Sequence, residues 1–414
     1  MTAPKLTYIP DILEEHFEEL AFLWGQRMVA LRSPAYSWKK FAALEERIEA
    51  HVQGLLAVGS RLREFATPFL TSEEASEAFA AGYALLRMRT ESATQHVLSA
   101  FTTAKGSQLE GLKQALCHGL RRRFLVRLHD LVRPLGTPLS AAAAEILAFH
   151  GVADTRAADL EILLGHGDPE IQRAGWRIAA LSGVLVSPHT YASTMKSADA
   201  GVRHEAMIAA AWQGQTGLLV VLRCYVGNLD EKNWDAMLLL AILGQPEDLE
   251  RILAIGDAAA LGPRRFQALG AFGHPCVVDA LLAAVENPDP GCAAAAGAAF
   301  TKITGADIRS GKRAEVPAEG GGESDFDKEF QEVVVLPDPG RARQHWQSVR
   351  VNFASATRVC GGFALGASVD PGVLDQLDME SRRQALFRGR FEGAWNGKPA
   401  ELERFPMTGA RRPA

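Results

Sequence analysis

Glycines recur along the chain at a nearly constant spacing, and each one follows an apolar stretch with helical periodicity. The spacing is about 31 residues, which suits a repeat made of two helices. Glycine often ends a helix because the residue after the last turn commonly adopts a left-handed conformation. The recurring positions are Gly151, Gly183, Gly214, Gly244, Gly273 and Gly305. This pattern predicts an array of two-helix repeats over residues 136–305.

Helix starts follow the same register. The first helix of each repeat is expected just after the glycine, at residues that accept backbone N–H groups or tolerate the first turn: Asp154, Ser187 with Pro188, Thr216, Pro246 and Pro275. The second helix is expected after an acidic cap at Asp168, Asp199, Asp230 and Asp289. Each repeat therefore has the same internal order of caps, helices and terminal glycine.

Aligning the second helices on their terminal glycines gives apolar columns and one column of mixed chemistry. Seven residues before the glycine stand Ala144, Trp176, Met207, Met237, Phe266 and Ala298. Two residues before it stand Phe149, Leu181, Trp212, Ile242, Ala271 and Ile303. We expect these columns to form one continuous core. Ten residues before the glycine stand Arg173, His204, Trp234 and Pro263, and this mixture predicts an exposed column.

The residues before the array have helical periodicity throughout. Apolar positions from Ile9 to Leu31 and from Trp38 to Val58 predict two long amphipathic helices. Capping boxes from Thr71 to Glu74 and from Ser107 to Glu110 predict further helix starts. We find no alternating strand pattern, so residues 1–135 are expected to form an N-terminal helical region.

After the array the composition becomes rich in glycine and acidic residues. Residues 306–336 are therefore predicted to be a linker, with 309–330 mobile. Helix starts at Asp338 and Asp370, each followed by proline, predict a C-terminal helical region over 337–414. The expected fold class is all-α: an α-solenoid of HEAT-like two-helix repeats flanked by N- and C-terminal helical regions.

Composition and charge narrow the classes of function. The formal charge of −5 gives no general electrostatic attraction to nucleic acid. The five cysteines are scattered, so we expect buried thiols in a reducing compartment. No apolar run approaches the roughly 18 residues that span a bilayer, and no signal peptide is evident. These features predict a cytoplasmic protein that does not enter a membrane.

Catalytic and metal-binding motifs are missing from the sequence. It has no phosphate-binding loop, nucleophile elbow or zincin motif, and its histidines and cysteines do not cluster at ligand spacing. Gly361, Gly362 and Gly366 are expected in a turn between helices, and His16 and His51 are expected as hydrogen-bonded core histidines. We therefore predict a protein that is not an enzyme, with no cofactor, no metal and no evident small-molecule substrate.

Two groups of side chains are candidates for binding a partner. Arg173, Arg177, Arg203 and Trp234 lie in or beside the mixed column, and Arg and Trp are enriched at interface hot spots. We predict that these four bind a protein partner. A basic run comprises Arg121, Arg122, Arg123, Arg127 and Arg133. It suits a solvated helix face, an acidic protein surface or, less readily, phosphate.

Several motifs together resemble a known family. The stretches from Asp168 to Trp176 and from Asp199 to Ala206 resemble the second helix of HEAT-like repeats, although Lys232 and Asn233 depart from the pattern in the next copy. Further motifs are His16 to Leu20, Leu44 to Arg47, Asp338 with Pro339 and Trp346, and Arg382 with Arg383. With these, the chain resembles an uncharacterised proteobacterial family of HEAT-like repeat proteins that is often encoded beside type VI secretion components.

The resemblance implies a function in binding another protein. It suggests an accessory factor of type VI secretion, an adaptor or chaperone for effector loading, with an effector or a spike component as partner. A toxin-neutralising immunity protein is a special case of this predicted function, because it too acts by binding another protein. The alternative is an enzyme on a HEAT-like scaffold, such as a DNA glycosylase or a bilin lyase. A glycosylase needs a basic groove with aromatic side chains, and the acidic balance of this chain argues against it.

Overall fold

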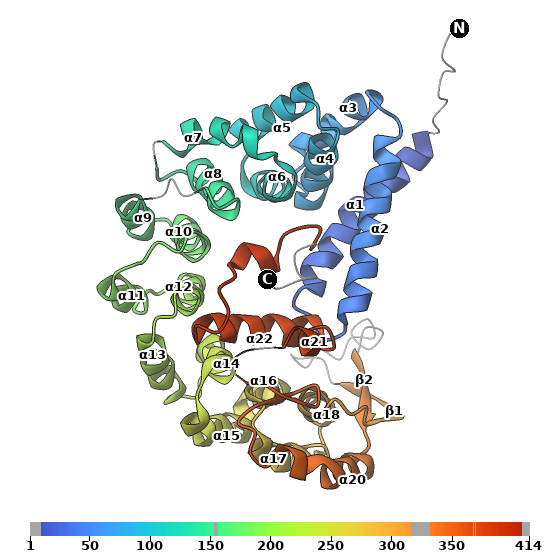
Figure 1. Cartoon of the computed structure of the whole chain (residues 1–414), viewed down its shortest axis with the longest axis vertical. Helices are drawn as coiled ribbons and strands as arrows, with labels where there is room; N and C mark the ends of the chain where they lie inside the picture. The colour runs from blue at the N-terminus through green and yellow to red at the C-terminus, as the bar shows by residue number, and fades with distance from the viewer. Residues whose placement is uncertain are drawn as a thin grey trace, which may run out of the picture. The chain divides into compact units, whose positions relative to one another are not determined.

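The computed structural model describes residues 10–133, 135–152, 156–316, 332–366, 368 and 370–407. These residues are mostly helical with few strands, which confirms the predicted helical class (Figure 1). A solenoid stays a prediction. The chain divides into two compact units: unit 1 is Met1–Gln213, Asp378–Arg383 and Gly397–Ala414, and unit 2 is Gly214–Leu377 and Gln384–Asn396. The division falls inside the predicted array, not at its expected ends.

Unit 1 begins with the two long helices expected from the sequence. Trp24 of the first helix stacks on Phe79, with 3.8 Å between the ring centroids. Its elements are α1 (Pro10–Ala30), α2 (Trp38–Leu56), α3 (Arg61–Ala66), η1 (Pro68–Thr71), α4 (Ala75–Arg87), α5 (Glu91–Thr103), α6 (Gly106–Gly119), η2 (Arg122–Phe124), α7 (Val126–Val132), α8 (Pro138–Phe149), α9 (Ala157–Leu164), α10 (Pro169–Ser182), α11 (Pro188–Thr194), α12 (Ala200–Trp212) and η8 (Pro399–Leu402). The predicted capping boxes are wrong, because Glu74 and Lys105 precede α4 and α6.

The predicted starts of the second helices are present in unit 1. Asp168 and Asp199 cap α10 and α12 by accepting hydrogen bonds from backbone N–H groups, and Gly183 ends α10 in the left-handed conformation with φ 72°. Helix α10 packs against α8, α9 and α12, as Figure 1 shows. Trp176 on α10 is fully buried by these neighbours. The start expected at Asp154 lies outside the described residues.

Unit 2 continues the helix pairs and adds short strands. Its elements are α13 (Gly217–Val226), η3 (Glu231–Asn233), α14 (Trp234–Leu243), η4 (Pro246–Asp248), α15 (Leu249–Asp257), η5 (Ala259–Arg264), α16 (Arg265–Phe272), η6 (Pro275–Val277), α17 (Val278–Ala284), α18 (Pro290–Thr304), β1 (Arg309–Val316), β2 (Glu332–Pro337), α20 (Pro339–Val349), η7 (Arg350–Phe353), β3 (Val359–Cys360), β4 (Phe363–Ala364), α21 (Pro371–Leu374) and most of α22 (Met379–Phe391). Helix α16 packs between α14 and α18.

Gly244 departs from the expected helix ending. Its φ is −59°, whereas the other glycines of the series are left-handed. The buried guanidinium of Arg358 donates hydrogen bonds to the carbonyls of Ala241, Gly244 and Phe272 at the ends of α14 and α16. Because a side chain satisfies these terminal carbonyls, α14 can end without a left-handed residue.

The predicted linker is wrong at both ends. Strands β1 and β2 pair antiparallel there, with Arg313 opposite Val335. Residues 317–331 of the same stretch lie outside the described residues. Gly361 and Gly362, expected between helices, instead connect β3 to β4 with φ values of 59° and 82°. Local composition did not predict the pairing of β1 with β2, because these strand partners are distant in the sequence.

The burial of the aligned columns agrees with the sequence only in part. Most apolar positions are buried, but Ala298 is exposed and both Ile242 and Ala271 are half-buried. The mixed column was predicted to be exposed, and this is wrong: Arg173, His204, Trp234 and Pro263 are all half-buried. Two contacts account for part of this burial: the Arg173 guanidinium lies 3.8 Å from Asp199, and the Arg264 guanidinium lies over the Trp234 ring.

Two other expectations concern the burial of the cysteines and the presence of membrane-spanning helices. The cysteines were expected to be buried, but Cys224 and Cys276 are exposed, whereas Cys117 and Cys292 are buried. None of the helices in the described part of the chain combines the length and apolar character needed to cross a bilayer.

Candidate peptide-binding site

The residues predicted to bind a partner do not form one site within either unit. Arg173, Arg177 and Arg203 belong to unit 1, whereas Trp234 belongs to unit 2. Arg173 pairs with Glu170, and Arg203 donates to the carbonyls of Ser197 and Ala198. The guanidinium of Arg264 lies 5.2 Å from the centroid of the Trp234 ring. Each side chain thus has contacts within its own unit, and their part in partner binding stays a prediction.

Arg177 belongs to a buried charge network. It lies 3.3 Å from the Glu145 carboxylate, whose oxygens also lie 3.2 Å from Lys113 Nζ. Burial raises the pKa of Glu145, but Lys113 and Arg177 outweigh burial and hold that pKa below its usual range. Glu205 lies 3.5 Å from Arg177. These contacts give Arg177 a structural role in linking α8, α10 and α12.

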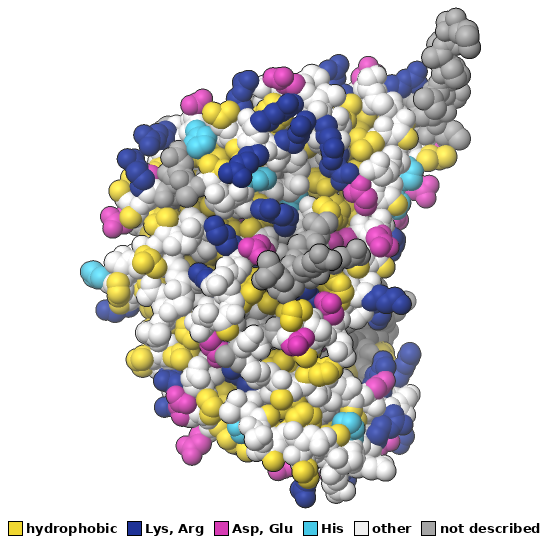
Figure 2. All heavy atoms as spheres, viewed as in Figure 1, with side chains coloured by type: hydrophobic (Ala, Val, Ile, Leu, Met, Phe, Trp, Pro, Cys, Tyr) yellow, Lys and Arg dark blue, Asp and Glu magenta, His cyan; other side chains and the backbone are white. Residues whose placement is uncertain are grey.

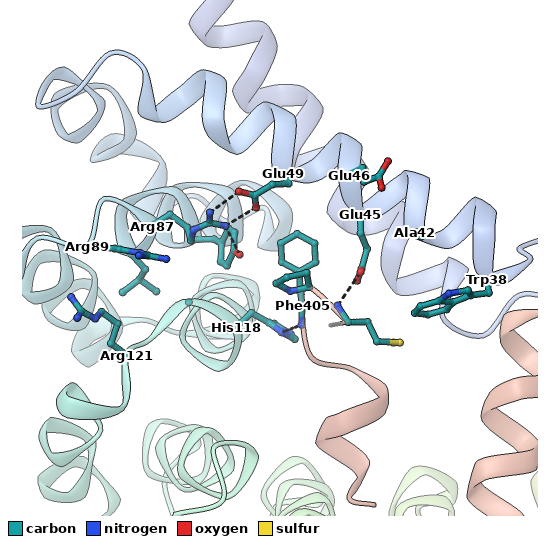
Figure 3. Close-up of a pocket in the computed structure, with 15 residues that line it drawn as sticks. Trp38, Ala42, Glu45, Glu46, Glu49, Arg87, Arg89, His118, Arg121 and Phe405 are labelled. Carbon is teal, nitrogen blue, oxygen red and sulfur yellow. Dashed lines mark hydrogen bonds and ion pairs between the residues drawn. The ribbon is translucent and has the colours of Figure 1, made fainter. Parts of the chain in front are cut away.

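Unit 1 contains a pocket of about 790 Å³. This pocket brings together charged and aromatic side chains that are able to bind a ligand. Its walls come from α2, α4, the end of α6 and the C-terminal residues (Figure 3). The lining residues are Trp38, Ala42, Glu45, Glu46, Glu49, Tyr83, Leu86, Arg87, Arg89, His118, Gly119, Arg121, Phe405, Pro406 and Met407. Of these residues, only Arg121 was predicted from the sequence to be a binding candidate, because the lining residues are far apart in the chain; Glu45 and Glu46 were noted only as part of a family motif.

The chain's own C-terminal segment, Glu403–Met407, lies along one side of this pocket and is bound through its backbone. Arg27 Nη2 donates to the carbonyls of Glu403 and Arg404, each at 3.0 Å. The N–H of Phe405 donates to His118 Nδ1 at 3.1 Å, and the N–H of Met407 donates to Glu45 Oε2 at 2.9 Å. The segment bends at Phe405 and Pro406, and side chains of the N-terminal helices bind its backbone much as they would bind a peptide.

The side chain of Phe405 fills an aromatic cavity beside these hydrogen bonds. Only 3% of Phe405 is exposed. Its ring makes edge contacts with Trp24 and Tyr83 at centroid distances of 5.9 and 5.6 Å. The Arg27 guanidinium lies 5.2 Å from the same ring. Such an aromatic anchor contributes strongly to the binding of a segment.

Burial determines the electrostatics at the centre of the site. Arg27 is fully buried, and burial lowers its pKa although Glu45, 2.8 Å away, opposes the shift. Burial also holds the pKa of His118 well below its usual value, with Arg27 adding to the effect. A neutral His118 keeps Nδ1 free to accept the Phe405 N–H. The site therefore combines one buried ion pair with a neutral imidazole acceptor.

The open part of the pocket has an acidic wall and a basic wall. Figure 3 shows Glu45, Glu46 and Glu49 along α2 and Arg87, Arg89 and Arg121 on the opposite side. Arg87 donates to both carboxylate oxygens of Glu49 at 2.7 and 2.8 Å, and this pairing raises its pKa. The basic wall thus has one arginine that is already paired.

Arg89 and Arg121 differ from Arg87 because both are exposed. Among the described residues, neither has a hydrogen-bond or ion-pair partner. Arg89 has φ 58°, a left-handed conformation that a residue with a Cβ rarely adopts. Both arginines follow the C-terminal end of a helix, where the helix dipole favours a cation. Their guanidinium groups remain available to an anionic ligand.

The basic wall continues onto the surface of unit 1. Arg122, Arg123 and Arg127 are exposed, and Arg123 lies over the ring of Phe124. Figure 2 shows Lys and Arg side chains gathered over the part of this face where α4 to α8 lie. We call Arg89, Arg121, Arg122 and Arg127 the basic rim. Among the described residues, no group of three or more His, Cys, Asp or Glu side chains is placed to hold a metal ion.

Comparisons with known proteins add little. No family model and no curated protein matches the chain. Among solved structures, the chain is similar to the crystal structure of an engineered protein from the Northeast Structural Genomics Consortium. The two share 14% identity, over 92% of this chain and 100% of that chain, with a TM-score of 0.31. A similarity of this size supports no statement about function.

Proposed function

We propose that this protein is a non-enzymatic adaptor or chaperone that binds an acidic segment of a protein partner at the basic rim. The observation behind the proposal is the pair Arg89 and Arg121, exposed at the mouth of the pocket with no acceptor among the described residues. The family resemblance adds the context of type VI secretion, with an effector or a spike component as partner.

Arginine suits this role because its planar guanidinium binds carboxylates with two hydrogen bonds. The Arg87–Glu49 pair within the same pocket has this geometry. A partner carboxylate that reaches Arg89 or Arg121 can form the same kind of pair. The basic rim also attracts an acidic segment from a distance, which raises the rate of association.

The acidic wall on α2 favours a protein partner over nucleic acid. Glu45 pairs with Arg27 and Glu49 pairs with Arg87, whereas Glu46 is exposed, so a phosphate backbone that entered the pocket would approach the Glu46 carboxylate. A protein segment can place acidic side chains against the rim and polar or basic side chains against α2. The two walls together therefore suit a segment of mixed charge.

The test is site-specific crosslinking in the native cell. The full chain carries a photo-crosslinking phenylalanine analogue in place of Glu46, which is exposed and lines the pocket. The crosslinked protein is identified by mass spectrometry. We expect a secretion effector or spike component, and we expect Arg89→Glu with Arg121→Glu to abolish the crosslink.

The matched control is Arg350→Glu, which reverses an exposed arginine in unit 2. The control should retain the crosslink. A crosslink that persists in the double variant, or one that forms to nucleic acid, would refute the proposal.

A further inference from the structure

We propose that the groove around Glu403–Met407 is an exchangeable peptide site, and that a partner segment with an aromatic side chain and the same backbone bend replaces the chain's own segment there. This inference rests on the proposed function and deepens it, since it names a second feature of the partner. The groove is formed by Arg27, Glu45 and His118 together with the aromatic cavity of Trp24 and Tyr83.

The hydrogen bonds of the groove are directed at backbone atoms. Arg27 binds two carbonyls, while His118 and Glu45 each accept a backbone N–H. A peptide that adopts the same bend at the positions of Phe405 and Pro406 offers these groups at the same spacing, so the hydrogen bonds select a backbone shape and not particular side chains. Only the amide accepted by His118 and the amide accepted by Glu45 exclude proline at their positions.

Selectivity comes from the aromatic cavity. Phe405 is the large side chain of the segment that enters it, with edge contacts to Trp24 and Tyr83 and the Arg27 guanidinium over its ring. A partner segment therefore needs an aromatic residue at this place. Glu403 and Arg404 add weaker preferences through Arg383 and the Phe149 carbonyl.

The walls of the groove have packing of their own. Trp24 stacks on Phe79, Phe79 stacks on Tyr83 at 5.4 Å, and α4 packs along α6. The groove thus keeps its shape through contacts among the N-terminal helices. Pro406 and Met407 line the pocket, so among the described residues the groove is open to an incoming segment at that end.

The tethered segment has an advantage over a free peptide. Because it belongs to the same chain, its effective concentration is on the order of millimolar. A partner overcomes this advantage by binding the basic rim at the same time. Contact with the rim holds the partner's aromatic segment close to the groove, so that binding of this segment in the groove also becomes an intramolecular step. Removing the Phe405 side chain should weaken the binding of the tethered segment, so that the groove becomes free for another peptide.

The experiment measures peptide binding to the full chain by fluorescence anisotropy. The probe is a labelled peptide of residues 398–407, and the proteins are wild type, Phe405→Ala and the control Phe353→Ala, which removes a buried phenylalanine from unit 2. We expect the peptide to bind Phe405→Ala at least about tenfold more tightly than wild type or the control. The same peptide carrying Phe405→Ala should not bind.

Folding is followed in the same samples by thermal melting. A peptide that binds Phe405→Ala, or raises its melting temperature, supports the exchange. The proposal is overturned if the Phe405→Ala chain is folded but binds no peptide. It is also overturned if this variant is unfolded and the peptide does not restore folding. In either case the segment would be a fixed part of the core. These outcomes do not involve the basic rim, so they are independent of the crosslinking result.

Discussion

The Arg27 guanidinium lies 2.8 Å from the Glu45 carboxylate, and each of these side chains also binds the backbone of the C-terminal segment. A buried ion pair is stable only when its remaining donors and acceptors are satisfied. Residues 403–407 satisfy part of this requirement for both members. The pair therefore couples the N-terminal helices to the end of the described chain.

Replacing Arg27 tests this coupling. Arg27→Met leaves Glu45 buried without its cation, so we expect a loss of about 3–5 kcal/mol in the free energy of unfolding. The double variant Arg27→Met with Glu45→Met removes both charges and should lose much less. Chemical denaturation of the full chain measures both values. Arg32→Met, which alters a half-exposed arginine nearby, is the control, and an equal loss there would refute the prediction.

The apolar column of the second helices provides a test of the repeat core. Trp176 is fully buried, so Trp176→Ala should cost about 3–5 kcal/mol. Phe266→Ala in unit 2 should cost a similar amount. Trp234 is half-buried, and Trp234→Ala is expected to cost less. Thermal melting followed by circular dichroism compares the variants, and unchanged midpoints for Trp176→Ala and Phe266→Ala would show that the register is wrong.

Arg177 was predicted from the sequence to bind a partner, but its contacts predict an effect on stability. Arg177→Gln removes a cation from the buried Glu145, and we expect a loss of about 1–3 kcal/mol at pH 7. Glu145 has a lowered pKa in the folded chain, so the stability it contributes is present above its unfolded pKa of 4.5. That contribution disappears as the pH falls through the folded pKa.

The difference between wild type and Arg177→Gln should therefore shrink in acid. Denaturation at pH 7 and below pH 4.5 measures this change. Arg173→Gln serves as the control, because its partner Glu170 is largely exposed and such pairs contribute less than about 1 kcal/mol. A larger loss for the control than for Arg177→Gln would contradict the structural role of Arg177.

His118 should make the stability of unit 1 depend on pH. Burial keeps the imidazole neutral in the folded chain, with Arg27, His150 and Arg404 opposing protonation. The unfolded chain takes up a proton near pH 6.5, so folding stability falls as the pH drops below that value. A single such group contributes a slope of about 1.4 kcal/mol per pH unit.

The variant His118→Asn isolates this contribution. It retains an acceptor for the Phe405 N–H but does not titrate, so its stability should fall less steeply than that of wild type between pH 6.5 and 5. Urea denaturation across this range measures the slopes. Burial also lowers the pKa of His150 and of His51, and these groups titrate alike in both proteins. Equal slopes would show that His118 takes up a proton as readily in the folded chain as in the unfolded chain.

Local sequence determined where the repeat helices begin and end. Asp168 caps α10 and Gly183 ends it because both effects depend on residues within one helical turn. The caps at Asp338 and Asp370 follow the same rule, and the structure has both. Helical periodicity likewise predicted α1 and α2, since an amphipathic face is visible in the sequence alone.

Only the tertiary structure determined which distant residues meet. No local pattern predicts that Arg309–Val316 and Glu332–Pro337 pair as strands, because the hydrogen bonds between these strands join residues that are far apart in the chain. It also predicted exposure for Arg173 and Trp234, whose coverage depends on neighbouring helices. The candidate site is the clearest case: Arg27, Glu45 and His118 have ordinary local patterns, and they form a binding groove only where Phe405 reaches them. Periodicity and caps describe single helices, whereas a binding site is produced by packing between them.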